Sequence, residues 1–105
     1  MSNAVRKVVL TDAFLDRTSA IEQFLGRDKS RRGRVFVAAL LDFVYDTVGP
    51  LPLAFPAYVL ASHPQLPLRR AVFQRRYNVL YAVSATEVRF LTLFSTAQNP
   101  SDVEL

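Results

Sequence analysis

Four arginines lie close together in the second half of the chain: Arg69, Arg70, Arg75 and Arg76. A guanidinium group is a planar fork of N–H donors that matches the oxygens of a carboxylate or a phosphate. If this stretch forms a strand, successive side chains alternate between the two faces of a sheet, so Arg69 and Arg70 point to opposite sides. At least one arginine then faces away from the helices. There it could hold phosphates, lie beside stacked bases or pair with carboxylates of a partner segment. The alternative is a solvated basic strand that discourages aggregation.

Two further features could take part in chemistry. Segment 27–34 holds five cations in eight residues, which could contact nucleic acid or simply form a water-facing turn. His63 is the single histidine, and histidine is the residue type most often used for proton transfer. It is therefore a candidate general acid or base, the alternative being an exposed loop histidine.

Other classes of site are excluded or weakly supported. The chain has no cysteine, which excludes disulfides, thiolate metal sites and a cysteine nucleophile. A single histidine removes most histidine-based metal sites, and the three glycines form no phosphate-cradling loop. Asp42 and Asp46 share one helix face and are best explained as a solvated surface. We therefore expect neither a metal nor a cofactor, while a Ser–His–Asp arrangement stays open.

Length and composition describe one ordinary globular domain. The chain has 105 residues, of which 50% are hydrophobic and 21% charged, so a disordered chain is excluded. We expect a single domain over residues 1–105, with a core over 5–95 and a polar, mobile tail over 96–105. The net charge of +4 suits an acidic polypeptide or a nucleic acid as partner. No run is long and apolar enough for a signal peptide or a membrane span, so we expect a cytoplasmic protein without a membrane partner.

The first half of the chain predicts a strand and two helices. Residues 5–10 are short and rich in β-branched side chains, as in a strand. Thr11 and Asp12 offer a helix N-cap, and the apolar stripe that follows predicts a helix over 12–25. After a basic turn, a second amphipathic helix extends to Gly49-Pro50. Two helices joined by so short a turn form an antiparallel hairpin.

The second half predicts an irregular loop and three strands. Residues 50–67 hold five of the six prolines and are expected to form either a packed irregular loop or a functional one. Alternating patterns then predict strands over 68–74, 77–84 and 87–95. In the last strand, Val88, Phe90, Thr92 and Phe94 should share one face. The short connections require antiparallel pairing. The expected fold is therefore α+β, in the order β-α-α-β-β-β, with the helical hairpin packed on a four-stranded antiparallel sheet.

This order, together with the sequence of segment 68–83, resembles the RelE/ParE superfamily, the toxins of type II toxin–antitoxin modules. The family core has an arginine, then Arg-Tyr, two apolar residues, a tyrosine and a valine. In this chain the core falls on Arg70, Arg76, Tyr77, Tyr81 and Val83.

The resemblance implies a growth inhibitor of the plasmid-stabilisation type. Phe55-Pro56 is similar to the Phe-Pro that many ParE-like members carry after the second helix. In the family, a cognate antitoxin wraps the toxin across the hairpin and the sheet, giving a hetero-oligomer. A basic domain with an arginine-bearing sheet suits such an acidic segment.

The superfamily contains two branches with different targets. ParE-like members are not nucleases and are associated with inhibition of DNA gyrase, whereas RelE-like members cut mRNA on the ribosome. This chain lacks the His, Tyr or Arg that nuclease members place after the last strand, so the ParE-like branch is favoured and no catalytic residue is assigned. ParE-like members usually carry basic residues there, and these are missing too, so a non-toxic divergent binding domain is a further alternative. The candidate contacts for antitoxin or target are Arg69, Arg70, Arg75 and Arg76. A ribonuclease would use Arg70, Arg76, Tyr77 and His63.

Overall fold

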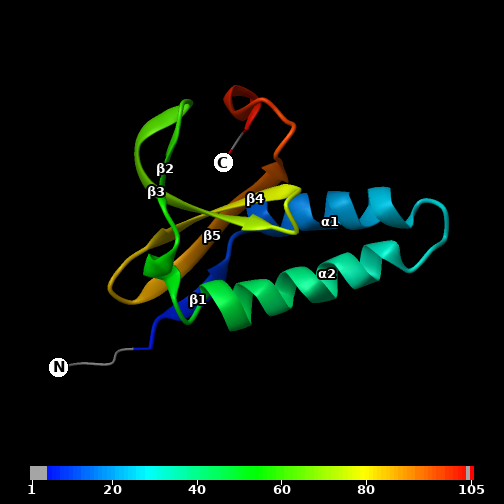
Figure 1. Ribbon diagram of the computed structural model, residues 1–105, viewed down its shortest axis with the longest axis horizontal. Coiled ribbons are helices and arrows are strands. Elements are labelled where there is room, and N and C mark those ends of the chain that lie inside the picture. Colours follow the sequence, from blue (N-terminus) through cyan, green and yellow to red (C-terminus); the bar gives the residue numbers. More distant parts are fainter. Residues whose placement is uncertain (1–4, 104) are drawn as a thin grey trace.

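The computed structural model describes residues 5–103 and 105 (Figure 1). In chain order the elements are β1 (Lys7–Leu10), α1 (Asp12–Gly26), α2 (Arg32–Asp42), η1 (Phe43–Val48), η2 (Pro52–Ala54), β2 (Ala57–Leu60), β3 (His63–Phe73), β4 (Tyr77–Val83), β5 (Glu87–Ser95) and η3 (Pro100–Asp102). The strands form one five-stranded sheet in the order β1-β5-β4-β3-β2. β1 runs parallel to β5 and all other neighbours are antiparallel, so the sheet is mixed. The α+β class and the helical hairpin against the sheet are confirmed.

The proline-rich segment 50–67 was predicted as an irregular loop, which is wrong for its second half. Residues 50–56 contain no strand, but Ala57–Leu60 form β2 and the segment from His63 onward begins β3, which adds a fifth strand to the sheet. Proline cannot donate a backbone hydrogen bond and is therefore tolerated mainly at sheet edges. Pro64 and Pro67 satisfy this rule because pairing between β3 and β4 begins only at Arg69, so the earlier part of β3 pairs with the edge strand β2 alone.

Local chemistry accounts for the start of the first helix and the end of the second. The Thr11 side chain caps α1 by accepting a hydrogen bond from the Phe14 backbone N–H. α2 continues into the π-helical turn η1, which closes with a hydrogen bond from the Gly49 N–H to the Val44 carbonyl. The buried residues Leu40, Val44 and Val48 recur every four residues. Four residues of an α-helix turn about 40° further than one full turn, so such residues drift around the helix. The wider π turn offsets this drift, so Val48 stays in the core with Val44.

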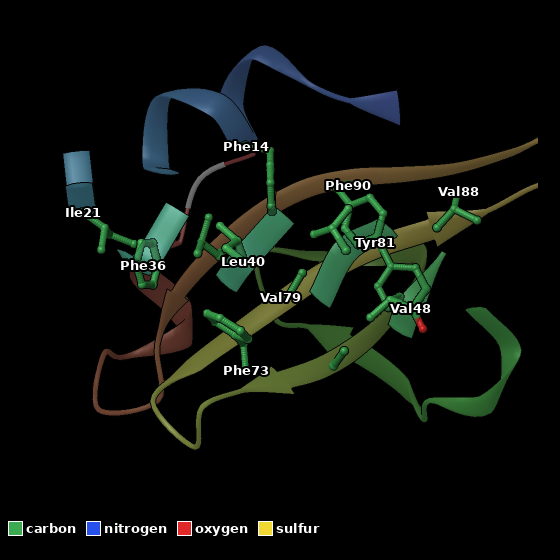
Figure 2. Close-up of a cluster of buried hydrophobic side chains, with 13 residues drawn as sticks. Phe14, Ile21, Phe36, Leu40, Val48, Phe73, Val79, Tyr81, Val88 and Phe90 are labelled. Carbon is green, nitrogen blue, oxygen red and sulfur yellow. The ribbon is translucent and has the colours of Figure 1, made fainter. Parts of the chain in front are cut away.

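The main core lies between the helical hairpin and one face of the sheet (Figure 2). Aromatic rings fill much of it, including Phe14 against Phe90 and Phe36 against Phe73. The buried side chains are Phe14, Ile21, Phe36, Leu40, Val44, Val48, Ala71, Phe73, Val79, Tyr81, Val88, Phe90 and Leu93.

A bulge in β5 overturns the simple alternation expected for that strand. Tyr81 pairs with Phe90 and Leu80 pairs with Thr92, so Leu91 is an extra residue. An extra residue reverses the facing of all that follow it. Consequently Leu93 joins the helix-side core, whereas Phe94 lies in a second cluster on the other face.

That second cluster gives the sheet an apolar outer side, opposite the helices. It consists of Leu60, Leu68, Leu80, Phe94 and Val103. Val103 is only 4% exposed, so the segment up to this residue, expected to be a tail outside the core, instead packs onto the sheet. Its turn is capped by the Asn99 side chain, which accepts a hydrogen bond from the Ser101 N–H. No helix in the described part of the chain is long and apolar enough to cross a membrane.

Candidate functional site

The structure distributes the four candidate arginines over separate places. Arg69 points to the helix side of β3, where its guanidinium donates to the Phe55 carbonyl at 2.6 Å. Nearby, the buried Tyr81 hydroxyl donates to the Pro52 carbonyl, also at 2.6 Å. Burial raises the pKa of Tyr81 to about 12, although the charge of Arg69 acts in the opposite direction. Arg69 and Tyr81 therefore hold the segment that leads into β2, a structural role.

Arg70 lies on the outer side of the sheet, as alternation predicts. It is half-buried, and its guanidinium carbon lies 5.3 Å from the centre of the Tyr58 ring, within the range of a cation–π contact. Its Nε is buried and has no hydrogen-bond partner among the described residues. Asn78, diagonally across on β4, is 6% exposed, and its Oδ1 is likewise unpartnered. One donor and one acceptor are thus unpaired on the same surface.

Arg75 occupies a turn of unusual backbone geometry. Gln74 and Arg75 have φ of 53° and 61°, and the Arg76 N–H donates to the Phe73 carbonyl at 3.1 Å. Two consecutive left-handed residues make a hairpin turn that ordinarily favours Asn and Gly. Two long side chains here carry a conformational cost, and strain of this kind is frequent at functional sites. The turn leaves Arg75 exposed and directs Arg76 toward the helices.

Arg76 meets the start of α2 in a pocket of about 400 Å³. In Figure 1 the β3–β4 turn points toward the same end of the molecule as the α1–α2 turn. We call this site the arginine pocket. Its polar lining is Arg31, Arg32, Gln74 and Arg76, and its apolar lining is Leu25, Val35, Phe36 and Tyr77.

The charges around the arginine pocket are poorly compensated. Arg31 is the N-cap of α2, and the first turn of this helix contains no acidic residue. Cations at the positive end of a helix dipole are unfavourable. Asp28 approaches Arg32 at 3.7 Å, but both side chains are more than half exposed, so the pair is weak. Hydrogen bonds from Ser30 hold the pKa of Asp28 below its usual value. The carboxylate therefore stays ionised without neutralising the pocket.

The remaining candidates do not assemble into one catalytic centre. Tyr77 lines the arginine pocket, with its ring edge-on to Phe36 at 5.1 Å between centres. His63 begins β3, at the opposite end of that strand from Arg76, and its Nδ1 lies 3.0 Å from the Ser62 Oγ. Ser62, His63 and Asp102 border one open hollow, but no hydrogen bond joins Asp102 to the imidazole. No group of three potential metal ligands occurs in the part of the chain that the structure describes.

Sequence reasoning did not group the residues that the structure brings together. The basic segment 27–34 and Arg76 were both noted, but no local pattern linked them. Asn78 and Tyr58 carried no signal at all, because each becomes noteworthy only through its neighbours across the sheet. Compared with models of known protein families and with curated proteins, the chain matches none of them.

Proposed function

We propose that this protein is the toxin of a type II toxin–antitoxin module, ParE-like, neutralised by a cognate antitoxin and acting by binding a target such as DNA gyrase. One observation carries this proposal. Within the described chain, neither Arg70 on the outer side of the sheet nor Arg76 at the arginine pocket forms an ion pair. The two ion pairs that occur there are those of Arg32 and Arg89. An acidic partner segment would supply the missing carboxylates.

The architecture supports the same proposal. A short strand, a helical hairpin and an antiparallel set of strands follow one another in the order on which the resemblance depends. The hairpin lies on one side of the sheet (Figure 1). Arg70 lies on the other side, where its guanidinium faces the Tyr58 ring. The additional strand β2 extends the sheet at the far edge and leaves this order intact.

The distribution of acid–base groups favours a binding protein over a nuclease. Cleavage through a ribose hydroxyl needs a general base, a general acid and a phosphate-binding group around one point. His63 lies at the far end of β3, and Tyr77 lies on the helix side while Arg70 lies on the outer side. Tyr81 is fully buried, with a pKa raised to about 12 by burial. It is unsuited to proton transfer at neutral pH.

A second candidate function is a RelE-like mRNA interferase that acts on the ribosome. The observation that favours it is the unpartnered Nε of Arg70, whose guanidinium lies over Tyr58. Such a group could hold a phosphate of bound mRNA, with the ribosome supplying the missing groups. If the protein acts in this way, replacement of Arg70 should abolish cleavage.

Controlled expression in a bacterial host separates these functions. We expect growth arrest, altered plasmid supercoiling and a DNA-damage response, together with intact mRNA in translation extracts. Co-expression of a small acidic protein encoded beside the gene should restore growth and co-purify with the chain. Arg70→Ala should weaken this complex. Arg89→Ala is the matched control, since Arg89 pairs with Glu87 on β5.

Each alternative has its own signature in this experiment. Cleavage of mRNA at the ribosomal A site that disappears in Arg70→Ala would favour the interferase. Growth arrest with unchanged supercoiling and no DNA-damage response would contradict the gyrase target. Harmless expression of the folded protein from a strong promoter would overturn toxicity and favour a divergent binding domain.

A further inference from the structure

We propose that the arginine pocket binds a nucleoside polyphosphate, with the phosphates against Arg31, Arg32 and Arg76 and the base against Tyr77. This site goes beyond the proposed function and does not depend on it. Its volume of about 400 Å³ lies within the range of small-molecule sites. Its lining combines several guanidinium groups with an apolar wall, which is the pairing that an organic phosphate requires.

The charge arrangement favours a polyanion. Arg31 and Arg32 come from the start of α2, and Arg76 comes from the turn after β3. Their only acidic contact within the described chain is the weak pair between Asp28 and Arg32. Three like charges that share one pocket repel one another, and a chain of phosphate groups would offset this repulsion with bidentate hydrogen bonds. A single carboxylate would leave part of the charge unmatched.

The apolar side of the pocket favours a planar body attached to the phosphates. Phe36 is 5% exposed and packs edge-on against both Phe73 and Tyr77. Tyr77 is half-buried, so part of its ring borders the pocket while Phe36 holds it in place. Bases stack on aromatic side chains of this kind without strict sequence preference. A bare inorganic anion would leave this wall unused.

The backbone on both sides of the pocket is fixed by close contacts. The Arg76 N–H donates to the Phe73 carbonyl at 3.1 Å, and the Arg76 carbonyl accepts from the Thr96 N–H at 2.8 Å. On the opposite side, Gly33 lies against the Glu22 backbone so closely that a side chain there would clash, which fixes the start of α2 against α1. The two turns that carry the arginines are therefore held next to each other before a ligand binds.

The test is an NMR titration of the ¹⁵N-labelled full chain with ATP in the absence of Mg²⁺. We expect saturating shifts at amides of the α1–α2 and β3–β4 turns. Arg76→Ala should weaken ATP binding by about tenfold or more, the usual loss for one charged hydrogen-bonding group. Arg31→Ala is a second variant with the same expectation. Arg27→Ala is the matched control, because Arg27 lies in the same basic turn but stacks on Phe24 and is not part of the pocket lining.

The ligand's two parts are tested separately. Tripolyphosphate should bind more weakly than ATP, and adenosine should produce no saturating shifts. Tyr77→Leu should weaken binding of ATP while leaving that of tripolyphosphate unchanged. Non-saturating shifts, or an equal loss in Arg27→Ala, would overturn the site. Equal affinity for ATP and tripolyphosphate would overturn the nucleotide assignment. None of these results depends on toxicity. Arg76 belongs to both proposals, whereas Arg70 is not part of the pocket lining, so Arg70→Ala tests the antitoxin contact separately from the nucleotide site.

Discussion

Arg31 and Arg76 line one pocket, although the first precedes the second helix and the second follows the longest strand of the sheet. Their meeting joins two basic segments that are separate in the chain. It also leaves cations at the N-terminal end of α2, where an acidic residue would stabilise the helix. Three arginines therefore share a pocket at which the described chain supplies only the weak pair between Asp28 and Arg32 as compensation.

Tyr81 anchors the segment between the second helix and β2. Replacing it by phenylalanine removes the hydroxyl that donates to the Pro52 carbonyl. We expect the free energy of unfolding to fall by about 1–2 kcal/mol, since a buried hydrogen bond is lost and its acceptor is left unpaired. Urea denaturation measures the change. Tyr45→Phe is the control, because Tyr45 is 48% exposed and its substitution should have little effect. Equal stabilities of Tyr81→Phe and the unchanged protein would contradict the anchoring role.

The same tyrosine makes stability depend on alkaline pH. Its pKa is raised from 10.0 to about 12 in the folded protein by burial. The folded state therefore retains the proton over a pH range in which the unfolded chain releases it. The contribution to stability is complete below pH 10 and is lost as pH rises toward 12. The difference in stability between the unchanged protein and Tyr81→Phe should shrink from pH 9 to pH 11.5. A constant difference over that range would show that Tyr81 titrates normally.

Thr11 connects the helix to the bulge in the sheet. Its side chain caps α1, and its hydroxyl donates to the Phe90 carbonyl at 2.8 Å, beside the extra residue Leu91. Thr11→Ala should lower the free energy of unfolding by about 1–2 kcal/mol through loss of the cap. Thr11→Ser retains the hydroxyl and should recover most of this loss, as measured by thermal or urea unfolding. If serine is as damaging as alanine, the methyl group rather than the hydroxyl is responsible.

Val103 closes the apolar cluster on the outer side of the sheet. It packs with Leu60, Leu68, Leu80 and Phe94. Val103→Ser should lower the free energy of unfolding by about 1–3 kcal/mol, because buried apolar area is lost and a hydroxyl is introduced there. It should also increase binding of a hydrophobic dye such as ANS.

The control for Val103 is a second position in the same segment. Leu105 is 38% exposed, so Leu105→Ser should change neither stability nor dye binding appreciably. If the two variants behave alike, the C-terminal segment does not hold the cluster together in solution.

Local patterns in the sequence determined the helical hairpin and the central strands. The capping pair at Thr11 and Asp12, the apolar stripe of α1 and the alternation along β4 all concern neighbours within a few residues, and each was confirmed. The opposite facing of Arg69 and Arg70 also followed from alternation alone.

Only the tertiary structure decided how distant segments meet. The prolines of β3 lie in a strand because that part of β3 pairs on one side only, which depends on where β2 and β4 lie. Leu93 and Phe94 lie on the opposite faces from those expected, because the pairing with β4 shifts by one residue. Val103 is buried because it packs against apolar side chains on the outer side of the sheet. The arginine pocket has the same origin. Guanidinium groups from two turns share a site only after the sheet and the hairpin have packed together. No local pattern in the sequence indicates that these two turns lie next to each other.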